Sequence, residues 1–319
     1  MMKGIGLRAG FVMLFLIGLF ASGAFATEPL PAVPPIPADN TMTPVKIELG
    51  KMLFFDPRLS SSGVISCATC HNPSFAFTDR VSRALGHKHQ VGPRNTPTVL
   101  NSAFLKVQFW DGRAASLEEQ ALGPIQASVE MNESLENVVK RLKGIKEYKD
   151  MFRESFGGRD PVTPANIAKA IAAFERTLIT TNSPFDRFLN GDKSAISKKA
   201  ERGWGFFQQK GCIACHNGPN FTNSSFQRIQ VPGSTDLGRF QVTKKEEDKY
   251  RFRVQSLRNV ALTYPYFNNG SVWRLEDAVK IMAREMLGIE PTKREVSEVV
   301  AFLKTLTGEM PEFDYPVLP

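Results

Sequence analysis

The sequence predicts an all-α protein built as two similar halves, with long loops and little strand. Helix-start signals precede apolar residues spaced three and four apart, whereas the alternation typical of strands is scarce. The 24 glycines and 21 prolines are numerous enough to supply long loops. One set of sequence patterns also occurs twice along the chain, which indicates an internal duplication.

The composition is that of a globular protein. Of the 319 residues, 42% are hydrophobic and 23% are charged, and a chain of this length is typical of about two domains. These values exclude an intrinsically disordered chain, a collagen and a multi-span membrane protein. The formal net charge is +8, but no block of lysines and arginines indicates binding to nucleic acid.

The N-terminus, residues 1–26, has the pattern of a signal peptide. Lys3 and Arg8 precede the apolar run Phe11–Phe20, and residues 24–26 form an A-x-A cleavage site. The apolar run is short for a membrane span, and an uncleaved anchor is the alternative. In both cases the body of the protein is expected outside the cytoplasm, in an oxidising compartment. Cleavage removes two positive charges and no acid, which lowers the net charge from +8 to +6.

A proline-rich lead-in over residues 27–42 is followed by capping signals that predict where three helices begin. Ser116 to Glu119 and Thr292 to Glu295 have the spacing of a capping box, and Thr163 precedes a proline, as an N-cap residue does. Apolar residues at helical spacing follow two of these starts: Ile167, Ile171, Phe174 and Leu178, then Val296, Val299, Val300, Leu303 and Leu306. Gly308 is the predicted end of the last helix. The charged run Lys244–Lys249 is expected to be a solvated loop.

The duplication is visible in two pairs of segments. Gly50–Phe55 and Gly203–Phe207 each place a glycine and two phenylalanines ahead of a cysteine motif. Further along each half, residues 109–119 and 267–277 share the frame F-x-[DN]-G-x-x-x-x-L-E-[ED]. We therefore expect each half of the chain to form one domain of the same kind.

All four cysteines belong to two copies of the pattern C-x-x-C-H, the attachment signature of c-type haem. The residues are Cys67, Cys70 and His71 in the first copy, and Cys212, Cys215 and His216 in the second. Two thiols add to the two vinyl groups of one porphyrin, and the adjacent histidine reaches the iron. A zinc site or a thioredoxin-like dithiol is the alternative, but zinc would need a fourth ligand from a chain with only four histidines.

The remaining iron ligands are limited by the number of histidines. With His71 and His216 as proximal ligands, only His87 and His89 remain, and both lie in the first half. The second haem therefore needs another sixth ligand, and methionine is the usual one, which raises the haem potential. Three methionines follow His216: Met282, Met286 and Met310. The sequence thus predicts two haems of different potential.

These features resemble the bacterial di-haem cytochrome c peroxidase family. Matching segments cover almost the whole mature chain: Cys67–Asn72, Gly86–His87, Gly92–Asn101, Gln108–Ala115, Gly123–Met131, Ser183–Gly191, Gly211–Gly218, Ser256–Phe267 and Leu275–Met282. The resemblance implies two cytochrome c-like haem domains. These would be an N-terminal, peroxidatic domain over residues 43–182 and a C-terminal, electron-accepting domain over 183–309, with a tail, 310–319, that packs back on the first domain.

The resemblance also assigns the sixth ligands. The Gly-His pair of the family falls on residues 86–87, which implies His87 rather than His89 as the ligand of the first haem. Its A-V-x-x-M frame falls on residues 278–282, which implies Met282 as the ligand of the second haem. Met286, one helical turn later, is the fallback.

Further site residues are implied by the same resemblance. Glu130 would be the acid–base residue at the first haem, Gln120 would be the active-site glutamine, and Trp110 would lie between the haems as an electron relay. An interdomain calcium site is implied at three positions: Asn95, Thr263 and Pro265.

The function implied by the resemblance is that of a periplasmic peroxidase with two covalently bound haem c groups and calcium. It would reduce hydrogen peroxide to water with electrons from a small c-type cytochrome or a cupredoxin. The oxidised first haem would become reactive after His87 leaves its iron, and Glu130 would then move the proton. The resemblance also implies a homodimer.

Two other functions stay open. The first is a di-haem electron carrier of a respiratory chain with incidental peroxidase activity, which would have no need of Glu130 and Gln120. The second is a relative that oxidises a protein substrate through both haems. Such relatives carry tyrosine in place of the methionine, and Met282 argues against this function, although Tyr264 and Tyr266 lie nearby in sequence.

Overall fold

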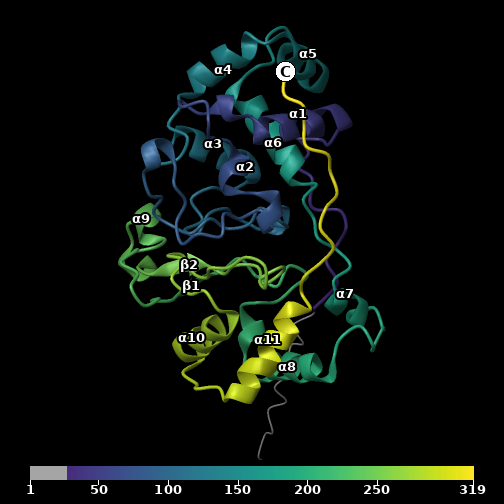
Figure 1. Ribbon diagram of the computed structural model, residues 1–319, viewed down its shortest axis with the longest axis vertical. Coiled ribbons are helices and arrows are strands. Elements are labelled where there is room, and N and C mark those ends of the chain that lie inside the picture. Colours follow the sequence, from purple (N-terminus) through teal and green to yellow (C-terminus); the bar gives the residue numbers. More distant parts are fainter. Residues whose placement is uncertain (1–26) are drawn as a thin grey trace, which may run out of the picture.

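A computed structural model describes residues 27–319, and the predicted signal peptide at 1–26 lies outside the described residues. The chain forms two helical bodies stacked along its long axis, with a layer of loops and one small sheet between them (Figure 1). In the described part of the chain this sheet is one antiparallel pair, β1 (Phe226–Arg228) with β2 (Arg251–Arg253). The prediction of a mostly helical protein with little strand is confirmed.

The first body contains six helices and a core of its own. They are α1 (Pro44–Phe55), α2 (Cys67–Cys70), α3 (Leu117–Gln126), α4 (Leu135–Lys143), α5 (Lys146–Phe156) and α6 (Pro164–Glu175). Fully buried side chains such as Leu53, Tyr148 and Phe174 form the centre of this core.

The second body contains the remaining helices and a separate core. They are α7 (Pro184–Leu189), α8 (Lys198–Gln209), α9 (Phe240–Thr243), α10 (Leu275–Leu287) and α11 (Lys293–Lys304). Buried aromatic residues dominate here, with the rings of Phe185, Phe221 and Phe302 packed mostly edge to face. Within residues 27–319, no helix is long and apolar enough to cross a bilayer.

One closely packed helix pair supports each body. In the first body α1 lies against α6, and in the second α8 lies against α11. A Cβ atom on Gly50 would overlap the carbonyl oxygen of Ala170, and a Cβ atom on Gly203 would overlap that of Glu298. Both copies of the glycine-phenylalanine pattern thus place glycine where two helix backbones touch.

The helix starts expected from capping signals are confirmed. The Thr163 hydroxyl accepts from the backbone N–H of Asn166, and Thr292 forms the full reciprocal box with Glu295. Ser116 caps α3 by accepting from the N–H of Glu119. The Glu119 carboxylate instead accepts from the N–H of Ala115, so this box is only half formed.

Two local predictions need adjustment. The last helix ends at Lys304, before Gly308, which instead lies against the carbonyl oxygen of Thr180 and donates its N–H to Asn259. The prediction that Gly308 stops the helix is therefore wrong, because close contact between the bodies requires that glycine. The charged run Lys244–Lys249 is largely exposed, as expected, but contains a 3-10 turn at Glu246–Asp248.

The C-terminal residues run from the second body along the first (Figure 1). The ring of Phe313 lies 5.7 Å from that of Phe174 and 6.0 Å from that of Phe55, measured between centroids. The Arg58 guanidinium donates to the Pro319 carbonyl oxygen at 2.7 Å. The tail thus covers apolar side chains of α1 and α6.

A charged network joins the two bodies next to the sheet. Arg94 of the first body contacts Asp111 of its own body at 2.5 Å and Asp236 of the second at 2.6 Å. The backbone N–H of Asn95 donates to the carbonyl oxygen of Asn268 at 2.7 Å. These bonds hold the first body against the loops of the second.

Candidate haem sites and active site

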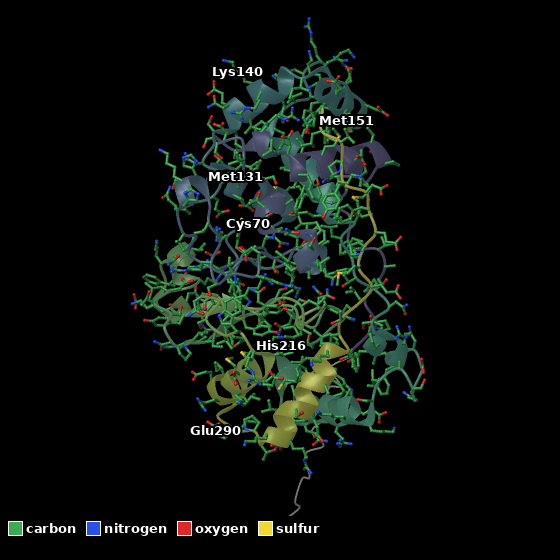
Figure 2. All side chains as sticks on the ribbon, in the orientation of Figure 1. Cys70, Met131, Lys140, Met151, His216 and Glu290 are labelled. Atoms are coloured by element: carbon green, nitrogen blue, oxygen red, sulfur yellow. The ribbon has the colours of Figure 1, made fainter. Side chains whose placement is uncertain are left out.

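Each C-x-x-C-H motif lies in the wall of its own cavity. The cavity of the second body has a volume of 460 Å³, and that of the first body is smaller, at 150 Å³. Figure 2 shows Cys70 in the upper body and His216 in the lower one, so the two motifs are well separated. In each cavity both thiols and the following imidazole are lining residues.

Local helical structure places the two thiols of each motif together. Cys67–Cys70 forms the short helix α2, and Cys212–Ala214 forms a 3-10 turn. No disulfide joins any of the four cysteines. Burial raises the pKa of Cys70 to about 12 and that of Cys212 to about 11, so both thiols are protonated at neutral pH. A thioredoxin-like dithiol needs a lowered thiol pKa, so this alternative does not fit.

The zinc alternative also lacks support in the described part of the chain. Within residues 27–319, no group of three or more histidine, cysteine, aspartate or glutamate side chains is arranged to hold a metal ion. A thiol pair beside one histidine on an apolar wall instead matches the chemistry of covalent haem attachment.

The two motif histidines are oriented in the same way. The Nδ1 atom of His71 lies 3.3 Å from the carbonyl oxygen of Phe77, and that of His216 lies 3.3 Å from the carbonyl oxygen of Phe221. A hydrogen bond at Nδ1 leaves Nε2 available to a metal and fixes the ring. Burial lowers the pKa of His216 to about 4 and also lowers that of His71, so both rings are neutral, as a ligand must be. The residues present therefore fit a haem in each cavity.

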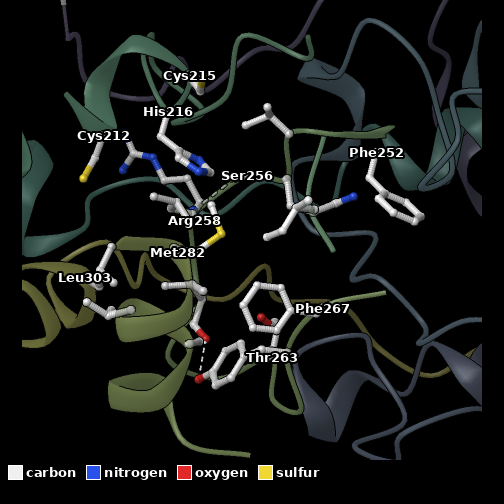
Figure 3. Close-up of a pocket in the computed structure, with 18 of the residues that line it drawn as sticks. Cys212, Cys215, His216, Phe252, Ser256, Arg258, Thr263, Phe267, Met282 and Leu303 are labelled. Carbon is white, nitrogen blue, oxygen red and sulfur yellow. Dashed lines mark hydrogen bonds between the residues drawn. The ribbon is translucent and has the colours of Figure 1, made fainter. Parts of the chain in front are cut away.

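Methionines of α10 line the second cavity. In Figure 3 the sulfur of Met282 and the imidazole of His216 face the same space. Met286 lines this cavity too, so both methionine candidates remain within it. Tyr266 also lines it, but its hydroxyl donates to the Val260 carbonyl oxygen at 3.1 Å. Tyr264 lies outside the lining and packs against Trp273.

Two side chains that could exchange or donate a proton line the first cavity and not the second. Gln120 of α3 and Glu130, which follows α3, are both in its wall. Burial raises the pKa of the Glu130 carboxyl, and the nearby Arg113 partly opposes this shift. Arg113 lines the same cavity and lies in the duplicated frame, where the second half has Ser271. This difference between the two copies of the frame is the one feature of the sequence that distinguishes Arg113.

His87 lies at the edge of the first site and is absent from the cavity lining. Its backbone N–H donates to the carbonyl oxygen of Glu130 at 2.8 Å, and its Nδ1 atom lies 3.2 Å from the Ser61 hydroxyl. The next two residues, Lys88 and His89, have φ values of 53° and 60°, which are strained for side-chain-bearing residues. His89 is exposed.

Trp110 lies in the wall that the two cavities share. It lines both of them, as does Asn95. The indole N–H donates to the backbone carbonyl oxygen of Asn95 at 2.9 Å. Asn95, Thr263 and Pro265, the three positions expected to hold calcium, all line the second cavity. The amide nitrogen of Asn95 donates to the carbonyl oxygen of Val81 at 2.9 Å.

A buried acid in the first cavity gave no sequence signal. Glu175, at the end of α6, is 3% exposed, and its Oε2 atom has no hydrogen-bond partner among the described residues. The adjacent Arg176 is bonded to Glu118, at 2.7 Å, and only partly opposes the effect of burial on Glu175. Burial raises the pKa of Glu175 to about 8. In the sequence it is merely a glutamate that follows an apolar helix face.

Comparisons with known proteins give a consistent result. A family profile described as di-haem cytochrome c peroxidase matches residues 44–194. The cytochrome c551 peroxidase of Nitrosomonas europaea is 47% identical over 98% of this chain and 95% of its own. The cytochrome c551 peroxidase of Pseudomonas aeruginosa is 49% identical over 85% of this chain and 81% of its own. Among solved structures, a MauG-like protein associated with microbial copper homeostasis is 28% identical with a TM-score of 0.79, and the match covers 91% of this chain and 95% of that one.

Proposed function

The chain belongs to the di-haem cytochrome c peroxidase family. We propose that its two halves have different roles in the reaction. It is a peroxidase that uses haem to reduce hydrogen peroxide. The first body would carry out the reaction with peroxide, and the second would receive the electrons. The observation that carries this division is that Glu130, Gln120 and Arg113 line the first cavity alone, whereas Met282 and Met286 of α10 line only the second. Met131 lines the first cavity, beside Glu130.

The residues of the first cavity would provide proton transfer. When bound, each haem supplies an iron that exchanges electrons, and the first also binds peroxide. The Glu130 carboxylate takes a proton from one oxygen of HOOH and returns it to the other, which leaves as water. Two electrons and two further protons complete the conversion to two waters. The raised pKa of Glu130 favours this role, since it brings the proton affinity closer to neutral pH.

Gln120 and Arg113 would orient the substrate. The amide of Gln120 can donate to a peroxide oxygen, and the Arg113 guanidinium supplies positive charge on the same wall. Arg113 is held in place by Asp111, at 3.1 Å, and by the ring of Phe109, whose centroid lies 3.4 Å from the guanidinium carbon. Arg113 would therefore act without large movement.

His87 would control access to the first site. We expect its imidazole to reach the iron in the oxidised protein and to withdraw when the second haem is reduced. The loop at Gly86 is suited to such coupling, because a Cβ there would overlap the Val129 carbonyl oxygen and because His87 donates to the Glu130 carbonyl oxygen. A displacement of His87 would therefore also move the backbone that carries the catalytic carboxylate.

Electrons would pass from the second haem, on His216 and Met282, to the first through Trp110. The indole lines both cavities, which supports this route. Calcium would bind nearby through the side-chain oxygen of Asn95 and the carbonyl oxygens of Thr263 and Pro265, all of which are hard ligands. Such an ion would join the two bodies at the wall that they share.

The remaining features extend the proposal. A signal peptide at 1–26 would deliver the protein to the periplasm, and a small c-type cytochrome or cupredoxin would donate electrons to a homodimer. Domain limits of 43–182 and 183–309 follow the two separate cores. The matched glycine contacts of Gly50 and Gly203 support an origin by internal duplication.

Peroxide turnover measured before and after reduction of the second haem tests this function. The oxidised protein should be nearly inert, and addition of one electron equivalent per chain, with calcium present, should abolish a lag. His87→Gly should be active without this treatment. Immediate turnover by oxidised wild type with a five-coordinate first haem would contradict the switch, whereas no turnover in any state would contradict the peroxidase function.

A further inference from the structure

Arg253 is a buried cation without an acidic partner among the described residues. It ends β2, is 3% exposed and lines the second cavity. Its guanidinium donates only to neutral groups: from Nε to the Phe109 carbonyl oxygen at 3.1 Å, from Nη2 to Gln255 Oε1 at 3.0 Å and from Nη1 to the Val254 carbonyl oxygen at 3.4 Å. A guanidinium carries five N–H donors, so two are left over.

The other arginine of this cavity shows what a neutralised site looks like. Arg258 is paired with Asp186 at 2.7 Å and also donates to Ser183 at 3.0 Å. Arg253 has no such counter-charge, and burial alone lowers its pKa to about 10. A buried charge without a partner is costly, since neither water nor an opposite charge compensates its desolvation. The positive charge of Arg253 in this cavity is therefore not compensated by any described residue.

The position of Arg253 indicates which anion compensates that charge. Figure 3 shows that β2, at Phe252, lies across the cavity from Cys212, and Arg253 lines the cavity from the same strand. A haem attached at Cys212 and Cys215 is bound by its vinyl edge. The two propionates of a haem extend from the opposite edge of the porphyrin, and they are its only anionic substituents.

We propose that Arg253 binds a propionate carboxylate of the second haem, an inference that rests on the proposed attachment of haem at Cys212 and Cys215. The same residue holds the first body: its backbone N–H donates to the Trp110 carbonyl oxygen at 2.8 Å, and its Nε–H donates to Phe109. Arg253 thus joins the propionate edge of the electron-accepting haem to the segment that carries Trp110.

Resonance Raman spectra of the purified holoprotein test this assignment. In Arg253→Gln, the propionate bending mode of the second haem should shift, and the midpoint potential of that haem should fall because a positive charge is lost. Arg253→Lys should restore both towards wild type. Arg251→Gln is the matched control, since Arg251 lies on the same strand, outside the cavity lining, and donates to Glu247 and Phe226 carbonyl oxygens.

The outcomes separate this inference from the proposed function. If the wild type lacks a second covalent haem by mass, the proposed function itself fails. If Arg253→Gln keeps both haems, but its propionate mode and second potential match wild type, the inference is wrong and Arg253 only joins the two bodies. If that variant does not fold, a crystal structure of the wild-type holoprotein decides: a propionate oxygen within about 3.2 Å of the guanidinium supports the inference, and a longer separation contradicts it.

Discussion

The two halves of the molecule use the same framework around two different cavities. Counted from the leucine of the shared frame, Leu117 in α3 and Leu275 in α10, the position seven residues later is Pro124 in the first half and Met282 in the second. Both residues line their cavity. A thioether can ligate iron, whereas a proline side chain has no donor atom.

The two helices also differ in length. α10 continues for 13 residues through Met282, whereas α3 ends at Gln126 after ten residues, two positions beyond its proline. The chain that follows α3 turns back and brings Glu130 into the cavity wall. Under the proposed function, the second half would supply a permanent sixth ligand, Met282, whereas the first would place the proton-transferring Glu130 beside a site that His87 can leave.

Removal of either thiol pair should have the largest effect. Cys67→Ser with Cys70→Ser should leave one covalent haem and no peroxide turnover, because the reactive site is lost. Cys212→Ser with Cys215→Ser should also leave one covalent haem, but abolish electron entry. Mass spectrometry of the denatured protein checks both, and wild type should carry two haem masses. A wild-type mass that matches the chain with four free thiols would contradict covalent haem attachment in both halves.

Glu130→Gln should lower turnover by roughly 10²–10⁴-fold, since an amide of the same size cannot carry the proton. Both haems should be retained. Glu136→Gln, on an exposed position of α4, is the control and should keep wild-type turnover. Steady-state peroxide consumption by the activated enzyme measures the effect. If Glu130→Gln keeps more than about a third of the wild-type rate, Glu130 has no catalytic role.

Met282→His should lower the midpoint potential of the second haem by tenths of a volt, within the span of roughly 0.8 V that axial ligands cover. The reason is that a thioether favours ferrous iron more than an imidazole does. Met286→His is the paired variant, and it should leave the potential nearly unchanged. A redox titration that shows the reverse pattern would assign the ligand to Met286.

Glu175→Gln should remove a pH dependence of stability. The pKa of Glu175 is about 8 in the folded protein and about 4.5 in the unfolded chain, so the folded protein holds this proton more tightly. The free energy of unfolding therefore falls as the pH rises from about 4.5 to 8. The wild type should therefore lose on the order of 3 kcal/mol relative to the variant between pH 5 and pH 8. Urea unfolding at both pH values measures this difference. If the free energy of unfolding changes equally with pH in wild type and Glu175→Gln, the Glu175 carboxyl does not have a raised pKa in the haem-bound protein.

Gly50→Ala and Gly203→Ala should each destabilise the protein by about 1–3 kcal/mol, since a methyl group would push apart the paired helices. Gly205→Ala is the control in α8, where a Cβ would meet only the Gln209 side chain, at 3.9 Å. It should be neutral or stabilise the protein by up to about 1 kcal/mol. Equal urea midpoints for Gly203→Ala and Gly205→Ala would contradict the close helix contact.

Much of this organisation could be predicted from local sequence. The two C-x-x-C-H motifs, the helix starts at Thr163 and Thr292 and the scarcity of strand all depend on residues within one or two turns of each other. Short-range geometry decides such features, and the structure agrees with them. Gly308 was misread because its role depends on Thr180, which lies far away in sequence.

The sequence by itself determined the chemistry available: two thiol pairs, the histidine that follows each pair, and a methionine-containing helix in the second half. Only the tertiary structure decided which charges are compensated. Glu175 and Arg253 are ordinary residues in the sequence, yet each is buried in a cavity wall without a hydrogen-bonded partner of opposite charge. Desolvation depends on the packing of distant segments, so no local pattern of residues reports it. The same packing brings Trp110 into the wall shared by both cavities.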